Sequence, residues 1–347
     1  MRITFVLPSA VRIPMGGATV VFRHAEGLAK RGHMVTVLCQ SQLTDGIRGR
    51  AMALAARVRD RLHGLTGEPY YSPPGVATVQ VGRLVPEVVP NGDVLIATGW
   101  QTAEAVAHLP AAKGRKFYFV QGLESYQSPR ALDTWHLPMS RFTCAHWLAE
   151  RIRAAGEEVI GVVPNAVSPE HFYPERPIAG RRPSVVALYH RAEIKGPTEL
   201  IATLVNLRTR IPELEATVFS ARPPSHKLLG WVRIEVRPAV ERLRQMYNDA
   251  AVLLHTSTLE GWPLVPMEAA ACGCAVAGFA NEGVREYLAD GDTASLVEMG
   301  DVDALTEASA NLLTNETLRI ERATAARAAV AQFSWEASTD ILEGFLQ

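Results

Sequence analysis

The sequence predicts an α/β protein with two parallel β-sheets that helices cover on both faces. Short apolar runs of strand length alternate with amphipathic helical patterns, and this alternation occurs once in each half of the 347-residue chain. A proline-rich, aperiodic stretch at 163–183 separates the two halves, which is typical of a linker between domains. The chain is also long enough for two medium-sized domains.

The first half begins with a short buried strand and then alternates strands with helices. Strands are expected at Ile3–Leu7, Met34–Leu38, Thr78–Val81, Val94–Ala97, Lys116–Val120 and Arg141–Cys144. Helical patterns fall between several of them, at Thr19–Arg31, Thr102–His108 and Ala145–Ala155.

The second half repeats this order. Strands are expected at Ser184–Tyr189, Glu215–Phe219, Ile234–Val236, Val252–His255 and Ala275–Gly278. Helices are expected at Pro197–Arg210, Ala239–Asn248 and Pro266–Cys272, with further helices from Val302 onward.

Composition narrows the class of protein. The chain is 48% apolar and its net charge is −1, with acids and bases interspersed, which argues against nucleic-acid binding. Cys272 and Cys274 lack the spacing of zinc ligands, and four cysteines in such a chain favour a reduced intracellular protein. No early segment resembles a signal peptide and no apolar run could span a bilayer, so a cytoplasmic location is expected.

Two glutamates eight positions apart carry the most functional information. Glu260 is expected in the loop after the strand Val252–His255, and Glu268 in the first turn of the following helix. Ligands of parallel sheets bind at the carboxyl ends of strands, and the N–H groups of a helix start suit a phosphate. Two acids would repel that phosphate unless they faced another part of the ligand, such as sugar hydroxyls. A sugar-nucleotide has both parts.

Gly16 and Gly17 stand at the start of the first helix. Glycines there let the backbone approach a ligand closely, and the helix N-terminus favours an anion. The pattern is not the dinucleotide fingerprint Gly-x-Gly-x-x-Gly, and an ordinary loop turn is the alternative interpretation.

Five motifs in the same order resemble the large family 4 of retaining glycosyltransferases. They are Gly16-Gly17 with the segment 28–37, the segment 162–174, Arg191 to Lys195-Gly196, Glu260 and Glu268 with 269–273, and Phe333-Ser334-Trp335-Glu336. The resemblance covers nearly the whole chain. It implies the GT-B architecture, in which two Rossmann-like domains face each other across a deep cleft. The implied domains are 1–170 on the acceptor side and 171–332 for the nucleotide-sugar, with a closing helix at 333–347 that packs back on the first domain.

The resemblance also implies roles for residues of the second domain. Lys195 and Arg191 would neutralise the departing diphosphate, Glu268 would bind the ribose hydroxyls, and Glu260 would contact the donor sugar. Each role has an alternative. Lys195 and Arg191 could belong to a solvated basic loop, Glu268 could stabilise the helix dipole, and Glu260 could be a capping or loop acid. The spacing of Arg191 from Lys195 is shorter than is usual in the family.

This chain departs from the family in two places. The loop between the acids reads Gly261-Trp262-Pro263, and Pro263 has no N–H to donate, so phosphate donors are expected from Leu264 and Val265, with Trp262 beside the sugar. Gln121 occupies a position where many relatives have a histidine. Gln121 would form hydrogen bonds with sugar hydroxyls. It is equally open that Gln121 and Glu124 are ordinary loop residues.

A basic amphipathic pattern spans 47–62. It would suit the surface of the inner membrane face, although an ordinary domain helix with solvated arginines is the favoured interpretation.

The resulting expectation is a retaining enzyme that moves a sugar from a nucleotide-sugar to a hydroxyl acceptor, either a glycan or a lipid-linked molecule, in polysaccharide biosynthesis. No metal or other cofactor is expected, because fixed cations and helix dipoles can stabilise the diphosphate. A sugar-nucleotide epimerase of GT-B type and a non-catalytic sugar-nucleotide- or glycan-binding protein are the alternatives.

Overall fold

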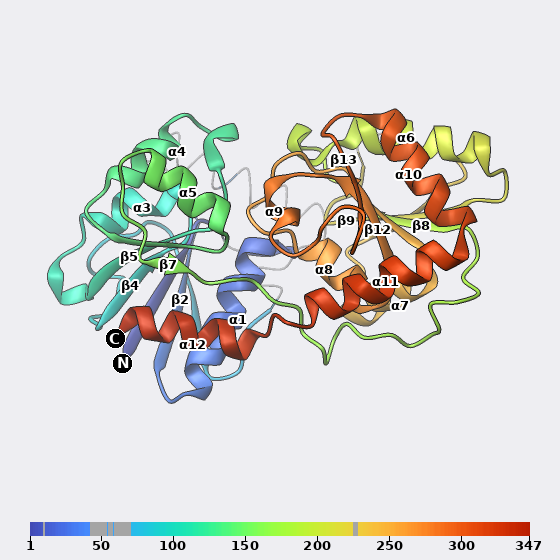
Figure 1. Ribbon diagram of the computed structural model, residues 1–347. Coiled ribbons are helices and arrows are strands. Elements are labelled where there is room, and N and C mark those ends of the chain that lie inside the picture. The colour runs from blue at the N-terminus through green and yellow to red at the C-terminus, as the bar shows by residue number, and fades with distance from the viewer. Residues whose placement is uncertain (10, 42–53, 55–57, 59–70, 225–227) are drawn as a thin grey trace. The chain divides into compact units, whose positions relative to one another are not determined.

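The computed structural model describes residues 1–9, 11–41, 54, 58, 71–224 and 228–347, which form two compact units (Figure 1). Unit 1 comprises Met1–Asn165 and Trp335–Gln347, and unit 2 comprises Ala166–Ser334. The chain enters unit 2 earlier than the boundary expected at residue 170. Further along the linker, His171 O accepts a hydrogen bond from Arg244, and the ring of Phe172 lies 6.0 Å from that of Tyr247.

Unit 1 is built on a parallel sheet of seven strands in the order β3-β2-β1-β4-β5-β6-β7. The strands are β1 (Arg2–Leu7), β2 (Met34–Gln40), β3 (Val76–Val81), β4 (Val94–Ala97), β5 (Arg115–Val120), β6 (Ser140–Thr143) and β7 (Gly161–Val162). The order reverses between β1 and β4, which makes the carboxyl ends of these two strands the topological switch point of unit 1.

Helices cover both faces of this sheet. They are α1 (Gly16–Lys30), α3 (Trp100–Ala107), α4 (Arg130–Asp133), α5 (His146–Ala154) and α12 (Trp335–Leu346). On one face, Val6 and Tyr118 pack in a core with Val106 of α3 and Ile152 of α5. On the other face Phe119 stacks on Phe142 at 4.7 Å.

The last helix, α12, lies beside α1 in unit 1 (Figure 1). Gly27 leaves room for Thr339, because a Cβ at Gly27 would lie 2.7 Å from the Thr339 hydroxyl. Charged groups fix the helix at its edge: Glu343 pairs with Arg31 at 3.3 Å and with His33 at 2.7 Å. The helix thus joins the first domain although it follows the second in sequence.

Unit 2 repeats the design with a parallel sheet in the order β10-β9-β8-β11-β12-β13. The strands are β8 (Ser184–Leu188), β9 (Glu215–Ser220), β10 (Arg233–Val236), β11 (Val252–His255), β12 (Ala275–Phe279) and β13 (Ser295–Val297). The switch point of unit 2 lies between β8 and β11. Its helices are α6 (Pro197–Arg210), α7 (Val240–Asp249), α8 (Leu264–Ala271), α9 (Glu282–Arg285), α10 (Val302–Thr314) and α11 (Glu316–Val330).

The alternation predicted from sequence is confirmed in both units, and the comparison also corrects some details. The short strands β7 and β13 escaped prediction because two or three residues give no readable period. The helix expected to begin at Pro266 begins at Leu264. Proline is tolerated in a first turn, where its missing N–H would have no partner within the helix.

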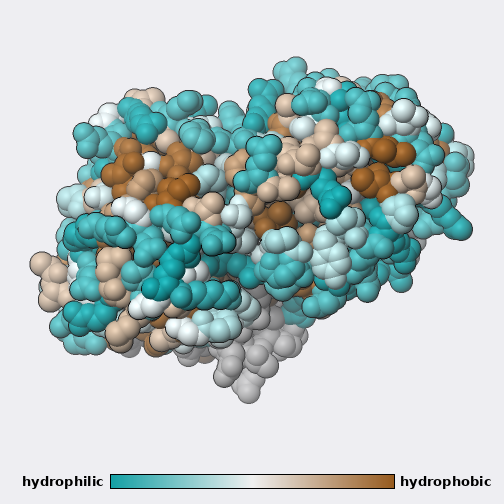
Figure 2. Space-filling view, turned by 60° about the horizontal axis from the view of Figure 1, so that its bottom comes forward, coloured by the Kyte–Doolittle hydropathy of each residue, from teal (hydrophilic) through white to brown (hydrophobic). Residues whose placement is uncertain are grey.

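Polar residues cover most of the face shown in Figure 2, and apolar side chains gather there in a few small areas. None of the described helices combines the length and the apolar character needed to cross a membrane. The basic pattern at 47–62 lies outside the described residues, apart from Leu54 and Val58.

The docking of α12 predicts a position-specific effect on stability. Leu342 is fully buried in unit 1, whereas its neighbour Ile341 is 39% exposed. Leu342→Ala should lower the free energy of unfolding of this domain by about 2–5 kcal/mol, through lost burial and a cavity. Ile341→Ala, the matched control, should cost about 0.5 kcal/mol. Urea unfolding measures both, and equal costs would contradict the docking described here.

Candidate functional site

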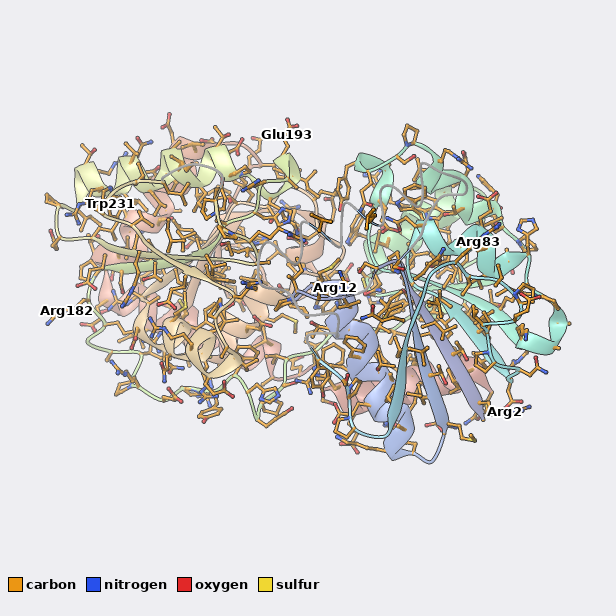
Figure 3. All side chains as sticks on the ribbon, turned by 180° about the vertical axis from the view of Figure 1, so that it is seen from behind. Arg2, Arg12, Arg83, Arg182, Glu193 and Trp231 are labelled. Carbon is orange, nitrogen blue, oxygen red and sulfur yellow. The ribbon has the colours of Figure 1, made fainter. Side chains whose placement is uncertain are left out.

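The loops after β8 and β11 meet at the switch point of unit 2. Figure 3 labels Arg182, which precedes β8, and Glu193, which follows it, and shows them at opposite ends of the strand. The loop after β8 ends in a single 3-10 turn, Glu193–Lys195, and the loop after β11 carries Glu260. Both loops therefore lie at the carboxyl ends of the strands, where parallel sheets bind ligands.

Gly196 holds these two loops together. Its φ is +61°, and a Cβ at this position would lie 2.2 Å from the carbonyl oxygen of Thr256. Only glycine fits such a conformation and such a close approach. Two hydrogen bonds complete the contact: Thr258 N donates to Ile194 O at 2.8 Å, and the Thr256 hydroxyl donates to Lys195 O at 3.0 Å.

This contact places Lys195 next to Glu260, and Lys195 Nζ donates to Glu260 Oε1. The side chains are 22% and 17% exposed, so both remain reachable from solvent. Burial raises the pKa of Glu260, but the charge of Lys195, the neighbouring His255 and a hydrogen bond from Ser257 outweigh burial and leave that pKa below its ordinary value. Glu260 is therefore an ionised acceptor that Lys195 neutralises.

Behind this ion pair lies His255, the last residue of β11, which is 5% exposed. Burial lowers the pKa of His255 to about 4, so the ring is neutral near pH 7. Asn281 Nδ2 lies 3.1 Å from His255 Nε2 and also donates to Ser257 O at 2.8 Å. Because an amide nitrogen only donates, His255 Nε2 is the acceptor and the ring proton resides on Nδ1.

Two glycines let neighbouring segments approach the Glu260 loop. A Cβ at Gly283 would lie 2.4 Å from Glu260 O, and a Cβ at Gly278 would lie 2.6 Å from His255 O. Gly283 thus lets α9 approach the backbone of Glu260, and Gly278 lets β12 approach the end of β11.

The N-terminus of α8 presents two backbone donors. Pro263 is the N-cap residue, Leu264 is the first helical residue and Pro266 is the third. The first four N–H groups of a helix have no acceptor within it, and two of the four positions here are prolines. The two donors that remain belong to Leu264 and Val265, the residues expected from sequence.

Glu268 lies in the second turn of α8, because the helix begins earlier than expected. It is half-buried, and its Oε2 accepts a hydrogen bond from the Tyr247 hydroxyl at 3.1 Å. Burial first, and then the charge of Glu268, raise the pKa of Tyr247 well above its ordinary value, so that Tyr247 is a permanent donor.

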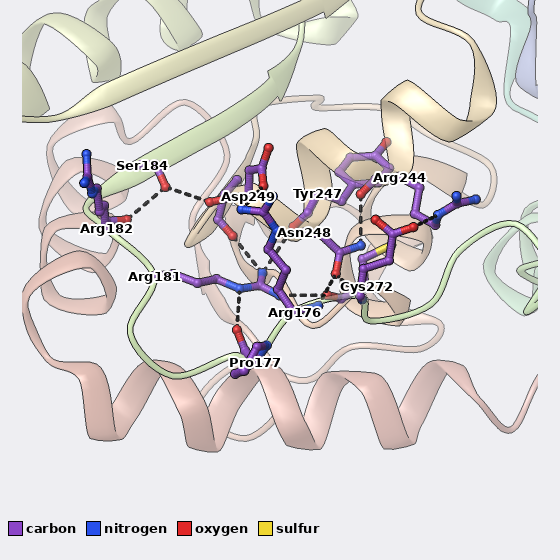
Figure 4. Close-up of polar contacts among 12 residues, drawn as sticks. Arg176, Pro177, Arg181, Arg182, Ser184, Arg244, Tyr247, Asn248, Asp249 and Cys272 are labelled. Atoms are coloured by element: carbon purple, nitrogen blue, oxygen red, sulfur yellow. Dashed lines mark hydrogen bonds and ion pairs between the residues drawn. The ribbon is translucent and has the colours of Figure 1, made fainter.

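Figure 4 shows how Tyr247 is fixed from below. Arg181, in the linker, donates to the carbonyl oxygens of Tyr247 at 3.2 Å, Ala250 at 2.8 Å and Cys272 at 2.9 Å. The half-buried guanidinium of Arg181 thereby ties the C-terminal ends of α7 and α8 to the linker.

Two residues expected at the site have other surroundings. Trp262 is 5% exposed, stacks on Tyr287 with ring centroids 5.4 Å apart, and lies edge-on to Phe333. It supports the Glu260 loop from inside and exposes little surface to a sugar. Arg191 is exposed and donates to Pro223 O at 2.9 Å, and among the described residues it pairs with no acid.

The remaining candidates belong to unit 1. Gln121 follows β5, and its amide packs against Gly17: a Cβ at Gly17 would lie 3.3 Å from Gln121 Oε1, whereas one at Gly16 would meet open space. Gln121 Nε2 donates to Thr98 O at 3.3 Å. Gly17 and Gln121 thus lie together at the switch point of unit 1, a separate site from that of Glu260.

A cavity of 490 Å³ lies at the other end of the sheet of unit 2, and its lining includes Ser184, Glu215 and Arg242. Its arginines already have partners, for example Arg176 with Asp249 at 3.0 Å and Arg242 with Glu235 (Figure 4 shows the Arg176 side). It faces the amino ends of the strands, so it does not belong to the site around Lys195 and Glu260.

Sequence reasoning did not predict the contacts that position the ion pair. Gly196, Thr256 and Asn281 act through contacts between segments that are far apart in the chain, and no local period reveals such contacts. The one available signal was the glycine directly before Pro197, since a glycine at a helix start often marks unusual backbone geometry.

Known proteins resemble this chain in sequence and in fold. The family model of the glycosyl transferases group 1 matches residues 180–329, which include Lys195, Glu260 and Glu268. Phosphatidyl-myo-inositol mannosyltransferase of Mycolicibacterium smegmatis is 25% identical over 96% of this chain and 90% of its own length. D-inositol 3-phosphate glycosyltransferase of Xylanimonas cellulosilytica is 32% identical over 44% of this chain and 40% of its own length.

Solved structures match over the whole chain. S. aureus TarM in complex with UDP has a TM-score of 0.76 at 8% identity, covering 100% of this chain and 99% of that one. Anabaena HepE in complex with UDP-glucose has a TM-score of 0.74 at 18% identity, with the same coverage. Identities this low show the fold alone. The chain is therefore a glycosyltransferase with the GT-B fold, and its residues 180–329 match the glycosyl transferases group 1.

Proposed function

We propose that the protein is a retaining glycosyltransferase of family 4 that transfers a sugar from a nucleotide-sugar to a hydroxyl group of a glycan or a lipid-linked acceptor. The observation that carries this proposal is the Lys195–Glu260 pair at the switch point of unit 2, in the same segment as the two free donors of α8. A nucleotide-sugar has an anionic diphosphate and a neutral, hydroxyl-rich sugar, and the site offers a partner for each.

The positive charge of Lys195 offsets the repulsion between a diphosphate and the two nearby acids, Glu260 and Glu268. The Lys195 ammonium group has three donors, and Glu260 uses one of them. The other two N–H groups of Lys195 can bind phosphate oxygens, while its positive charge neutralises Glu260. The second carboxylate oxygen of Glu260 then accepts hydrogen bonds from sugar hydroxyls. As the glycosidic bond to the donor breaks, negative charge grows on the diphosphate, and a fixed cation there stabilises the transition state.

The other residues complete the donor site in this proposal. The N–H groups of Leu264 and Val265 bind phosphate oxygens, and Glu268, held by Tyr247, binds the ribose hydroxyls. Arg191 provides a second cation once its side chain turns away from Pro223 O. Gly16, Gly17 and Gln121 belong to unit 1, and in this proposal they contribute to substrate binding from the acceptor-side domain.

Relatives support the donor and acceptor classes. One relative is named phosphatidyl-myo-inositol mannosyltransferase, and another is named D-inositol 3-phosphate glycosyltransferase. The structure of HepE was solved with UDP-glucose. We propose a cytoplasmic location on that basis, with membrane contact through 47–62 as the second option. The comparisons favour neither the epimerase nor the non-catalytic alternative, and product analysis with a panel of nucleotide-sugars separates all three.

Glu268→Ala tests the donor site directly. Loss of a charged acceptor for the ribose should weaken nucleoside diphosphate binding by about 2 kcal/mol or more, which is roughly thirtyfold in Kd. Isothermal titration calorimetry with UDP and GDP measures the effect. Glu213→Ala, an exposed acid of the same unit, is the matched control and should bind like the wild type. An unchanged Kd in Glu268→Ala would remove the ribose assignment.

We also propose that transfer needs no metal ion. Lys195, Arg191 and the N–H groups of α8 supply the positive potential that a divalent cation would otherwise provide. Activity should therefore persist in excess EDTA, with EDTA already saturated with magnesium as the control for ionic strength. Activity that EDTA abolishes and magnesium or manganese restores would contradict this arrangement.

A further inference from the structure

The loop that carries Glu260 is held at two points by a segment that begins two residues after β12. Asn281 Nδ2 donates to Ser257 O at 2.8 Å, and the Tyr287 hydroxyl donates to Pro263 O at 2.6 Å. Ser257 precedes Glu260 in the loop, and Pro263 follows it. The two hydrogen bonds therefore fix the backbone of the loop on both sides of the carboxylate.

Asn281 is completely buried, and its whole amide group is used. Its Oδ1 accepts a hydrogen bond from Val284 N at 3.0 Å, as the N-cap of α9. Because a backbone N–H can only donate, the atom that faces Val284 is the oxygen, and this settles the orientation of the amide. The amide nitrogen then has two protons, one for Ser257 O and one for His255 Nε2 at 3.1 Å. Asn281 thus joins the end of β11 to the loop that carries Glu260.

This arrangement requires an uncharged histidine. A protonated His255 ring would turn an N–H toward the N–H of Asn281, and neither could accept. Burial lowers the pKa of His255 to about 4. Two charges of the facing loops act in opposite directions, since Lys195 lowers that pKa and Glu260 raises it. Near neutral pH the ring therefore accepts the hydrogen bond from Asn281 and adds no charge to the site.

Ser257 connects these residues to the carboxylate of Glu260. It is 4% exposed, Asn281 binds its carbonyl oxygen, and its hydroxyl donates to Glu260. The ion pair with Lys195 engages Glu260 Oε1. One bond leaves a carboxylate free to turn about it, whereas a second bond from a buried hydroxyl restricts that rotation. The path from His255 through Asn281 and Ser257 therefore acts on the orientation of Glu260.

We propose that His255, Asn281 and Ser257 form a positioning network that orients Glu260 toward hydroxyl groups of the donor sugar. This inference rests on the proposed function and deepens it, because it separates recognition of the sugar from recognition of the nucleotide. The network acts only through Glu260, whereas Lys195 and Glu268 bind the diphosphate and the ribose in that proposal. Disrupting the network should therefore weaken binding of a nucleotide-sugar and leave binding of the bare nucleoside diphosphate unchanged.

Calorimetry with UDP, GDP, UDP-glucose and GDP-mannose tests this separation. The ratio of the Kd of a nucleoside diphosphate to that of its nucleotide-sugar reports the sugar contact alone. His255→Leu removes the acceptor for Asn281 and should lower this ratio about tenfold for the better sugar. His255→Gln keeps an acceptor oxygen and should retain most of the ratio. His24→Leu, the matched control, replaces another buried histidine, in unit 1, and should keep the wild-type ratio.

Two further measurements distinguish positioning from a general loss of structure. In a Glu260→Gln background, His255→Leu should change the ratio no further, because its effect passes through Glu260. Long-range 1H–15N NMR should show that the ring signal missing from His255→Gln belongs to a histidine that is neutral at pH 5.5. Its proton should reside on Nδ1, with or without nucleotide.

Three results would each overturn the proposal: an unchanged ratio in His255→Leu, an equal loss in the Glu260→Gln background, or a His255 ring with its proton on Nε2. Ser257→Ala removes only the hydroxyl that bonds Glu260, so it should lower the ratio in the same way and replaces His255→Leu if that variant fails to fold. Wild-type protein that shows the expected NMR signal but binds no nucleotide-sugar would instead count against the proposed function.

Discussion

The close approach of Gly196 to Thr256 is the constraint on which the site of unit 2 depends. It brings two loops that are sixty residues apart in sequence into contact, and it sets Lys195 on Glu260. The charge of Lys195 then helps to hold the pKa of Glu260 below its ordinary value. An isolated carboxylate, partly buried beside a helix start, would compete with a diphosphate for the same positive field, whereas a neutralised one can face a sugar. The backbone geometry of one glycine thus lets a single site suit a donor molecule that has both an anionic part and a neutral part.

The two units use the same topology for different chemistry. Each has a parallel sheet whose strand order reverses once, and in each the candidate residues lie at that reversal. Unit 2 places a lysine, two glutamates and two backbone donors there, which suits a charged ligand. Unit 1 places the amide of Gln121 and the carboxyl group of Glu124 there, and burial raises the pKa of Glu124 to about 7.

Much of the fold could be predicted from local sequence. The helix Pro197–Arg210 and the strand Val252–His255 have the predicted bounds, because a proline at the first helical position and a run of apolar residues are strong local signals. The start of α8 was placed two residues late because Pro266 resembles a helix start while lying in the first turn. The surroundings of Trp262 and Arg191 depend on residues distant in the chain, namely Tyr287, Phe333 and Pro223, which no local pattern indicates.

The most direct test of the central claim is whether Lys195 serves to neutralise Glu260 beside the diphosphate. The measurement is the Kd of UDP and GDP for the wild type, Lys195→Ala, Glu260→Ala and the double variant. We expect Lys195→Ala to weaken binding strongly, because it removes a cation and leaves an uncompensated carboxylate next to the phosphates. The double variant should then recover part of the lost affinity, since the repelling acid is gone as well. A double variant that binds no better than Lys195→Ala would show that Lys195 does not act by neutralising Glu260.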